Sequence, residues 1–128
     1  MTEDFSTEPF RIERIDHVQL AMPPGSEDQA VAFYQGLLNI PQVPKPPELA
    51  ARGGCWFERD GLCIHLGAED GFRPAKKAHP ALVVRGIEAL CAALEAAGHP
   101  VRHVEDVPGM PQWFIADPFG NRIELVPA

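Results

Sequence analysis

The stretch Asp117-Pro118-Phe119-Gly120-Asn121-Arg122-Ile123-Glu124-Leu125 decides how the end of this chain folds. Asp117, Pro118 and Gly120 occupy the first, second and fourth positions of a type I turn. The residues after the turn alternate between polar and apolar side chains, as in a half-buried strand. The stretch therefore predicts a hairpin with a four-residue loop and a last strand that carries Glu124 on one face.

A similar pattern occurs about 60 residues earlier in the chain. Asp60-Gly61 lies between two apolar runs and is a strong signal for a two-residue hairpin turn. The similarity extends upstream, because Asp16-His17-Val18 and Ala78-His79-Pro80 each begin a segment with a strand pattern. We interpret the chain as a duplication in which each half contains one strand, one helix and three further strands.

The two helices have different sequence signals. In the second half, Ile87, Leu90, Cys91 and Leu94 form one apolar face, and Gly98 with Pro100 ends the helix. In the first half, we expect Ser26 to cap a helix through a capping box closed by Gln29. The proline-rich run 41–47 is expected to hold an edge or irregular strand. The apolar face of the first helix consists of Ala30, Phe33, Tyr34, Leu37 and Leu38.

Composition indicates one acidic globular domain. The 128 residues include 11 Lys and Arg against 18 Asp and Glu, a net charge of −7, with 45% hydrophobic residues. Without a basic run, nucleic-acid binding is not expected. No apolar stretch approaches the roughly 20 residues of a membrane span, and the first residues do not resemble a signal peptide. Three cysteines without a CxxC pair suit a reducing compartment, so we expect the cytoplasm.

One strand face in each half carries residues capable of coordination. Side chains alternate between the two faces of a strand. In each of four strands the apolar neighbours face a helix, and one potential ligand faces the other way. These ligands are His17, His65, His79 and Glu124. Three imidazoles and one carboxylate suit a divalent Zn, Fe, Mn, Ni or Co ion. We therefore predict that the four side chains form a metal site.

Aromatic and polar neighbours are expected to complete this site. The two hairpin loops place Trp56 opposite His65 and Trp113 opposite Glu124, as walls of a substrate pocket. Gln19 lies on the same face and is assigned to substrate binding. Arg122 either anchors an anionic substrate group or orients Glu124.

The sequence assigns no chemical role to the histidines and linker residues outside this face. His99 and His103 are expected to be exposed to solvent. Phe72, Arg73, Lys76 and Lys77 join the two halves just before His79, and a solvated linker is favoured over a gate to the pocket.

The residues quoted above resemble the vicinal oxygen chelate superfamily, which contains glyoxalase I, extradiol dioxygenases, fosfomycin-resistance thiol transferases, methylmalonyl-CoA epimerases and bleomycin-binding proteins. The resemblance covers about residues 14–126, and the run 117–125 is its most specific part. It implies an α+β fold of paired βαβββ modules whose curved mixed sheets enclose a metal-site cavity. The expected organisation is a polar tail 1–13 and one glyoxalase-like domain 14–128, with module one at 14–67, a linker at 68–77 and module two at 78–126.

The resemblance also implies roles for the candidate ligands. By position, His17 is similar to the ligand of the first strand, His79 to the ligand that opens the second module, and Glu124 to the carboxylate of the last strand. His65 stands where glyoxalase I enzymes commonly have a carboxylate, which leaves Glu124 as the one carboxylate of the set. Strands or ligands are often exchanged across a homodimer in this superfamily, so a homodimer is expected.

Four functions remain open from the sequence. The leading hypothesis, which follows from the resemblance, is a glyoxalase-like lyase or isomerase whose small substrate chelates the ion through neighbouring oxygens. In this hypothesis the catalytic residues are Glu124, as ligand and proton shuttle, and His65, as a fourth ligand or general base. The alternatives are an extradiol-type dioxygenase that uses His17, His79 and Glu124 on iron, a fosfomycin-type thiol transferase, and a bleomycin-type binding protein that sequesters a drug without chemistry. The converging ligand set favours an enzyme over sequestration, because a sequestering pocket has no physical need for three imidazoles and a carboxylate.

Overall fold

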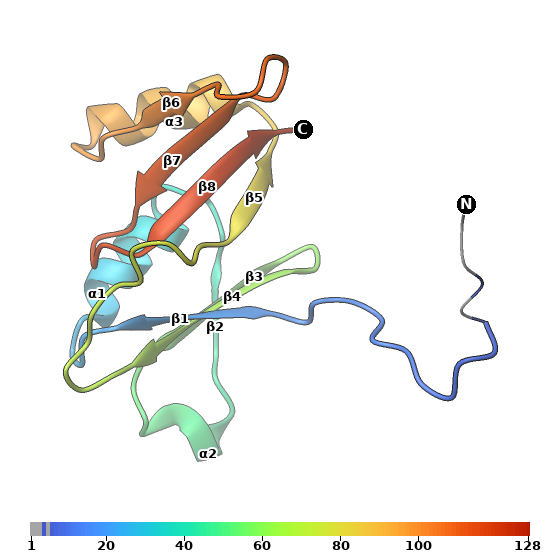
Figure 1. Ribbon diagram of the computed structural model, residues 1–128. Helices are drawn as coiled ribbons and strands as arrows, with labels where there is room; N and C mark the ends of the chain where they lie inside the picture. The colour runs from blue at the N-terminus through green and yellow to red at the C-terminus, as the bar shows by residue number, and fades with distance from the viewer. Residues whose placement is uncertain (1–3, 5) are drawn as a thin grey trace.

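A computed structural model describes residue 4 and residues 6–128, and it contains two four-stranded mixed sheets with the same topology (Figure 1). The first sheet has the order β1-β4-β3-β2 and the second β5-β8-β7-β6. In each sheet the first strand runs parallel to the last one, and the other pairs are antiparallel. The predicted α+β fold of duplicated modules is confirmed.

The first module contains four strands and two helical segments. Its central hairpin turns at Asp60 and Gly61, whose φ angles of 49° and 86° fit the predicted two-residue turn. The proline-rich run contains a strand of two residues, and a short helix that the sequence did not predict follows it. The elements are β1 Val18–Met22, α1 Glu27–Ala30, the π-helical η1 Val31–Gln35, β2 Gln42–Val43, α2 Pro47–Ala50, β3 Cys55–Arg59 and β4 Leu62–Ala68.

The second module repeats this order with one regular helix. Ile87 and Leu94 of α3 are buried, and Gly98, with a φ of 85°, allows the chain to leave the helix where the sequence predicted its end. The elements are β5 Ala81–Val84, α3 Ile87–Ala96, β6 Arg102–Val104, β7 Gln112–Ala116 and β8 Arg122–Pro127.

Two local predictions are wrong. Ser26 makes no side-chain capping bond, because its φ of −107° and ψ of 20° do not give the extended backbone that a capping residue uses. The loop between β7 and β8 spans the five residues 117–121, since Ala116 pairs with Arg122. This extra residue shifts the register of the last hairpin by one position.

A single hydrophobic core joins the two modules. Phe33 and Tyr34 from η1 belong to the same buried cluster as Ile115, Ile123 and Leu125 from the second sheet. At 25 cal/mol per Å² of apolar surface, burying one such side chain stabilises the fold by about 1.5–3 kcal/mol. The face of each sheet that carries these residues therefore turns toward the shared core, and the opposite face turns away from it.

A buried carboxylate links the two modules through hydrogen bonds. Asp117 accepts one from the Tyr34 hydroxyl at 2.7 Å, from the Asn121 side-chain amide at 2.8 Å, and from the backbone N–H groups of Phe119 and Asn121. Asn121 also donates to the carbonyl of Ala21 in β1, at 2.8 Å. Burial, followed by the charge and hydrogen bond of Asp117, raises the pKa of Tyr34 well above its ordinary value, so the phenol stays a donor.

The segment before β1 is irregular. Residues 6–17 contain no helix or strand and extend away from β1, with Phe10 and Ile12 exposed (Figure 1).

All three cysteines are free thiols, as predicted. None of the helices in residues 4 and 6–128 is long and apolar enough to span a bilayer.

We predict that Asp117→Ala lowers the free energy of unfolding by about 3 kcal/mol or more, because it leaves the buried Tyr34 hydroxyl, the Asn121 backbone N–H and one N–H of the Asn121 side-chain amide without an acceptor. Tyr34→Phe removes one donor and leaves no buried group unsatisfied, so its expected cost is about 1 kcal/mol. Urea unfolding of both variants measures the difference. Equal effects of the two changes would contradict the role of Asp117 as the shared acceptor.

Candidate metal centre

The first candidate half-site lies on the face of sheet one that turns away from the core. His65 is in β4 opposite Trp56, as predicted, and the two rings stack at 4.0 Å with an interplanar angle of 3°. His17 immediately precedes β1 and stacks on the other side of His65 at 4.3 Å. Trp56, His65 and His17 thus form a continuous stack that joins three separate segments of the first module.

The second half-site lies at the corresponding place in sheet two. His79 is two residues before β5, and its Nε2 atom lies 3.0 Å from Oε1 of Glu124 in β8. In both modules a histidine at the start of the first strand meets a side chain from the last strand, because β1 pairs with β4 as β5 pairs with β8. The duplication therefore produces two equivalent pairs, His17 with His65 and His79 with Glu124.

Each of the three imidazoles has one ring nitrogen engaged. Nδ1 of His79 lies 2.7 Å from the Lys77 carbonyl, which can only accept, so this nitrogen carries the proton. Nδ1 of His17 lies 2.9 Å from the Asp16 carboxylate, and Nε2 of His65 lies 3.2 Å from the Glu58 carboxylate. This arrangement is typical of histidines that bind a metal through the other nitrogen.

The pair of His79 and Glu124 shows the electrostatic consequence most clearly. Nδ1 carries a proton toward Lys77, and Nε2 lies 3.0 Å from a carboxylate oxygen of Glu124. Two lone pairs at this distance repel each other unless a proton or a cation lies between them. Two ligands that each lie about 2.0–2.2 Å from one ion are about 2.8–3.1 Å apart when the angle at the ion is about 90°, and about 3.3–3.6 Å apart in a tetrahedral site. The observed spacing of 3.0 Å fits the first geometry.

Glu124 is held by two hydrogen-bond partners. His79 lies at one carboxylate oxygen, and the Gln112 side-chain amide donates to the other at 3.0 Å. When a proton on Nε2 of His79 lies between the two groups, the hydrogen bond from His79, then that from Gln112, lowers the pKa of Glu124, and the positive charge of Arg122 adds to the shift. The carboxylate is therefore ionised at neutral pH, as a ligand for a cation must be.

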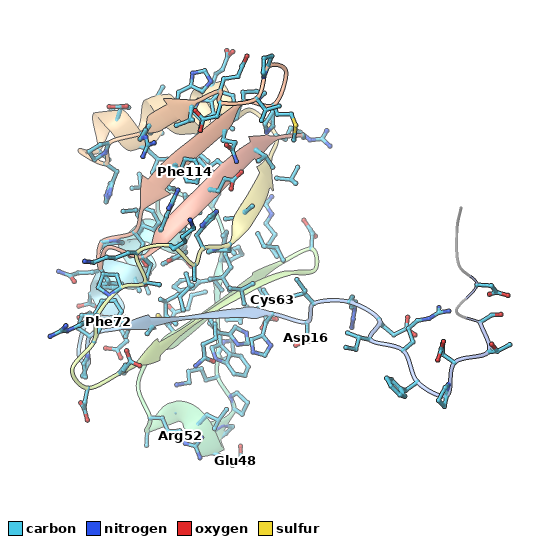
Figure 2. All side chains as sticks on the ribbon, viewed as in Figure 1. Asp16, Glu48, Arg52, Cys63, Phe72 and Phe114 are labelled. Atoms are coloured by element: carbon cyan, nitrogen blue, oxygen red, sulfur yellow. The ribbon has the colours of Figure 1, made fainter. Side chains whose placement is uncertain are left out.

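The prediction that Trp113 faces Glu124 is wrong. Because the loop has five residues, Trp113 pairs with Leu125 and packs against the core, while its ring stacks on the exposed His103 at 4.6 Å. Phe114, which Figure 2 labels on β7, takes its place opposite Glu124. The Arg122 guanidinium lies 4.3 Å from the centre of the Phe114 ring. Gln112 was not predicted from the sequence, because it shares a face with Glu124 only when the loop between β7 and β8 has five residues.

The structure places three of the predicted residues on one cavity. Gln19 from β1, His79 and Arg122 line a cavity of about 750 Å³ between the edges of the two sheets. Phe72 and Arg73 of the linker also line it, so this part of the linker is not simply solvated. Arg122 also donates to the Lys76 carbonyl at 3.5 Å, a long bond, and so lies between the linker and the ring of Phe114.

The four predicted ligands do not meet within one chain. Among residues 4 and 6–128, no three His, Cys, Asp or Glu side chains are grouped closely enough to hold a metal ion. The two sheets do not close around a common cavity as expected. Each contributes one face to the shared core, and the faces with the ligands turn away from that core. One chain therefore provides two separate pairs of ligands.

Comparison with known proteins places this architecture in a family. The model of the family described as "Glyoxalase/Bleomycin resistance protein/Dioxygenase superfamily" matches residues 14–125. A glyoxalase family protein from Bacillus anthracis is 43% identical, with a TM-score of 0.87, over 92% of this chain and 97% of that one. None of the curated proteins compared with the chain matches it.

Two more distant solved structures share the fold. The fosfomycin resistance protein FosX from Listeria monocytogenes is 17% identical, with a TM-score of 0.74, over 92% of this chain and 95% of that one. A lactoylglutathione lyase from Agrobacterium tumefaciens is 19% identical, with a TM-score of 0.60, over 87% of this chain and 92% of that one. Proteins with different activities therefore have this architecture, and the fold alone does not identify the reaction.

We predict that Gln112→Leu lowers the affinity for Zn²⁺ by about tenfold, because a residue that orients a metal ligand contributes about this much to affinity. Competition with a chelator of known affinity measures the change. Trp113→Leu is the matched control, which we expect to lose about 2 kcal/mol of stability through poorer packing while its Zn²⁺ affinity is unchanged. Loss of Zn²⁺ affinity in Trp113→Leu but not in Gln112→Leu would show that Trp113, not Gln112, borders Glu124.

Proposed function

Because the chain belongs to the Glyoxalase/Bleomycin resistance protein/Dioxygenase superfamily, we propose that it is a metal-dependent enzyme of the glyoxalase type. Its substrate is a small molecule that binds the ion through two neighbouring oxygens, and the reaction is a lyase or isomerase reaction. The observation that carries the proposal is the state of the imidazoles. His17 and His65 each have one ring nitrogen engaged and the other available, and His79 holds its second nitrogen against the Glu124 carboxylate.

The donor set fits a divalent transition metal. His17, His65, His79 and Glu124 would supply three nitrogens and one oxygen, a combination that suits Zn, Fe, Mn, Ni or Co. Asp16, Glu58 and the Lys77 carbonyl would fix the ring orientations. When bound, the ion supplies the positive charge that stabilises an oxyanionic or enolate-like state of the substrate.

Glu124 and His65 are the residues that would move or hold a proton. Glu124 is ionised and lies within reach of His79 and Gln112, so it can accept a proton from carbon or oxygen and return it. His65 has Glu58 behind Nε2, which leaves Nδ1 as a ligand or a base. A carboxylate behind an imidazole fixes the orientation of the ring, and so aims the other nitrogen.

Side chains near the two pairs would exclude water and orient the substrate. Trp56 stacks on His65, and Phe114 lies opposite Glu124, so each pair of ligands has one aromatic neighbour. Such apolar walls lower the local dielectric and strengthen the electrostatic interactions at the site. Gln19 and Arg122 face the cavity between the sheets and are assigned to substrate binding.

We propose further that a second copy of the chain completes the site. In such a homodimer, His17 and His65 of one chain meet His79 and Glu124 of the other, which gives two identical centres. Exposed apolar side chains flank both pairs and support this proposal, since Ile15 is 79% exposed and Val83 is 71% exposed. Met110, 65% exposed, borders the hollow next to Glu124.

We predict that the protein purified without a histidine tag contains about one transition-metal ion per chain, and that His79→Ala loses it because one of four ligands and the partner of Glu124 are removed. Elemental analysis by mass spectrometry measures the metal. His103→Ala, which removes an exposed imidazole on Trp113, is the control and keeps the metal.

The reaction is then assigned with the metal-loaded protein. Isomerisation of hemithioacetals without oxygen uptake supports the proposal, and oxygen uptake with catechols identifies a dioxygenase instead. A protein that binds no metal but binds drug-like cations would contradict the proposal and favour the sequestering function.

A further inference from the structure

A second polar hollow adjoins the first half-site. It has a volume of about 210 Å³ and is lined by Gln19, Trp56, Lys45 and Arg52, with Gly67 at its floor. Lys45 follows β2, and Arg52 follows α2, so the irregular segment after β2 carries both cations. Nothing in the metal centre described above uses these two charges.

The hollow adjoins the pair of His17 and His65 through Trp56 and Gln19. Trp56 belongs to both, because its ring stacks on His65 and also lines the hollow. Gln19 pairs with His65 in the β1–β4 register, and Gly67 lies two residues beyond His65 on the same face of β4. A substrate held at the two histidines can therefore extend along β4 into the hollow.

Gly67 keeps this path open. A Cβ atom at position 67 would lie 2.7 Å from the side-chain nitrogen of Gln19, so any larger residue would displace the amide. The absent side chain leaves room for Gln19 to lie beside β4 with its amide at the hollow. The amide thus offers a polar group between the histidines and the two cations.

The charges of Lys45 and Arg52 are not neutralised by ion pairs. The chain carries a net charge of −7, yet within its described residues neither of these side chains makes a salt bridge. Lys45 is half-buried and donates to the Gly53 carbonyl, which leaves two of its three donors available. Uncompensated positive charge around a hollow attracts an anion.

Two carboxylates belong to the surroundings of the hollow, those of Glu27 and Glu48. Glu27 accepts a hydrogen bond from the Gly54 backbone at 2.9 Å, so one of its oxygens is already engaged. Glu48 lies on α2 one turn before Arg52 and is exposed (Figure 2). Neither one pairs with the two cations, which remain available for a ligand.

The segment that carries the cations is restrained before any ligand binds. Pro44, Pro46 and Pro47 fix three backbone φ angles around Lys45. Gly54 has a φ of 88°, and a Cβ there would lie 2.0 Å from the Leu66 carbonyl, so the segment returns close against β4. A restrained segment loses little entropy when an anion is bound between its side chains.

We propose that this hollow is an anion subsite, in which Lys45 and Arg52, with the amide of Gln19, bind an anionic oxygen group of the substrate. The inference rests on the proposed function, because the same substrate would bind the metal through its neighbouring oxygens. It adds a substrate class, namely molecules with a metal-chelating head and a carboxylate or similar oxyanion several bonds away.

Hydroxamates test this subsite, since they chelate metals through two neighbouring oxygens. Acetohydroxamate is compared with the monohydroxamates of malonate, succinate and glutarate, which add a carboxylate on chains of increasing length. Calorimetric titration of the metal-loaded protein measures each dissociation constant. We expect at least one carboxylate-bearing ligand to bind about tenfold more tightly than acetohydroxamate, because charge-assisted hydrogen bonds are stronger than neutral ones.

Substitutions assign this gain to the two cations. Arg52→Gln and Lys45→Gln should each remove most of the carboxylate preference while leaving acetohydroxamate affinity unchanged, and Arg52→Lys should keep part of it. Arg102→Gln in β6 removes the same charge at a distance and is the matched control, so it should keep the full preference.

Two outcomes overturn the inference and are distinguishable. If acetohydroxamate binds but no carboxylate improves affinity, or if the gain survives both glutamine variants, the anion subsite is wrong and the metal centre stands. If acetohydroxamate itself does not bind, the proposed metal centre fails, and the subsite fails with it.

Discussion

The Asp117 carboxylate is the interaction on which the arrangement of this protein depends. It accepts four hydrogen bonds, one from Tyr34 in the first module and three from the loop between β7 and β8. These bonds fix the five-residue loop, and the loop fixes the register that places Phe114 opposite Glu124 and brings Gln112 to its carboxylate. The same loop reaches β1 through the bond from Asn121 to Ala21, so one buried charge sets both the last hairpin and the contact between modules.

This packing has a direct consequence for the metal centre. Because the two modules share one core, the faces that carry the ligands turn away from it, and each module presents its pair separately. The duplication explains why the pairs are alike, since a histidine before the first strand and a side chain in the last strand recur in both sheets. They differ in the second member, which is His65 in one module and Glu124 in the other.

The sequence predicted the fold well because its signals were local and repeated. The stripe of Ile87, Leu90, Cys91 and Leu94, and the turn at Asp60-Gly61, depend only on neighbouring residues. The loop after Ala116 was predicted one residue too short, because the side chain of Asp117 bonds to the backbone of Asn121 and extends the turn. No sequence pattern shows that Tyr34 lies beside Asp117, or that the two ligand pairs remain apart within one chain, since both follow from contacts between distant segments.

The exchanged centre is tested most directly by combining two defective chains. One chain carries His17→Ala and His65→Ala with one affinity tag, and the other carries His79→Ala and Glu124→Ala with a second tag, neither tag containing histidine. In the mixed dimer, one centre loses all four ligands and the other keeps all four. We expect each pure variant to lack metal and the mixed dimer, isolated through both tags, to contain about one ion per two chains. Mixed dimers without metal, formed from variants that fold normally, would contradict a centre built from two chains.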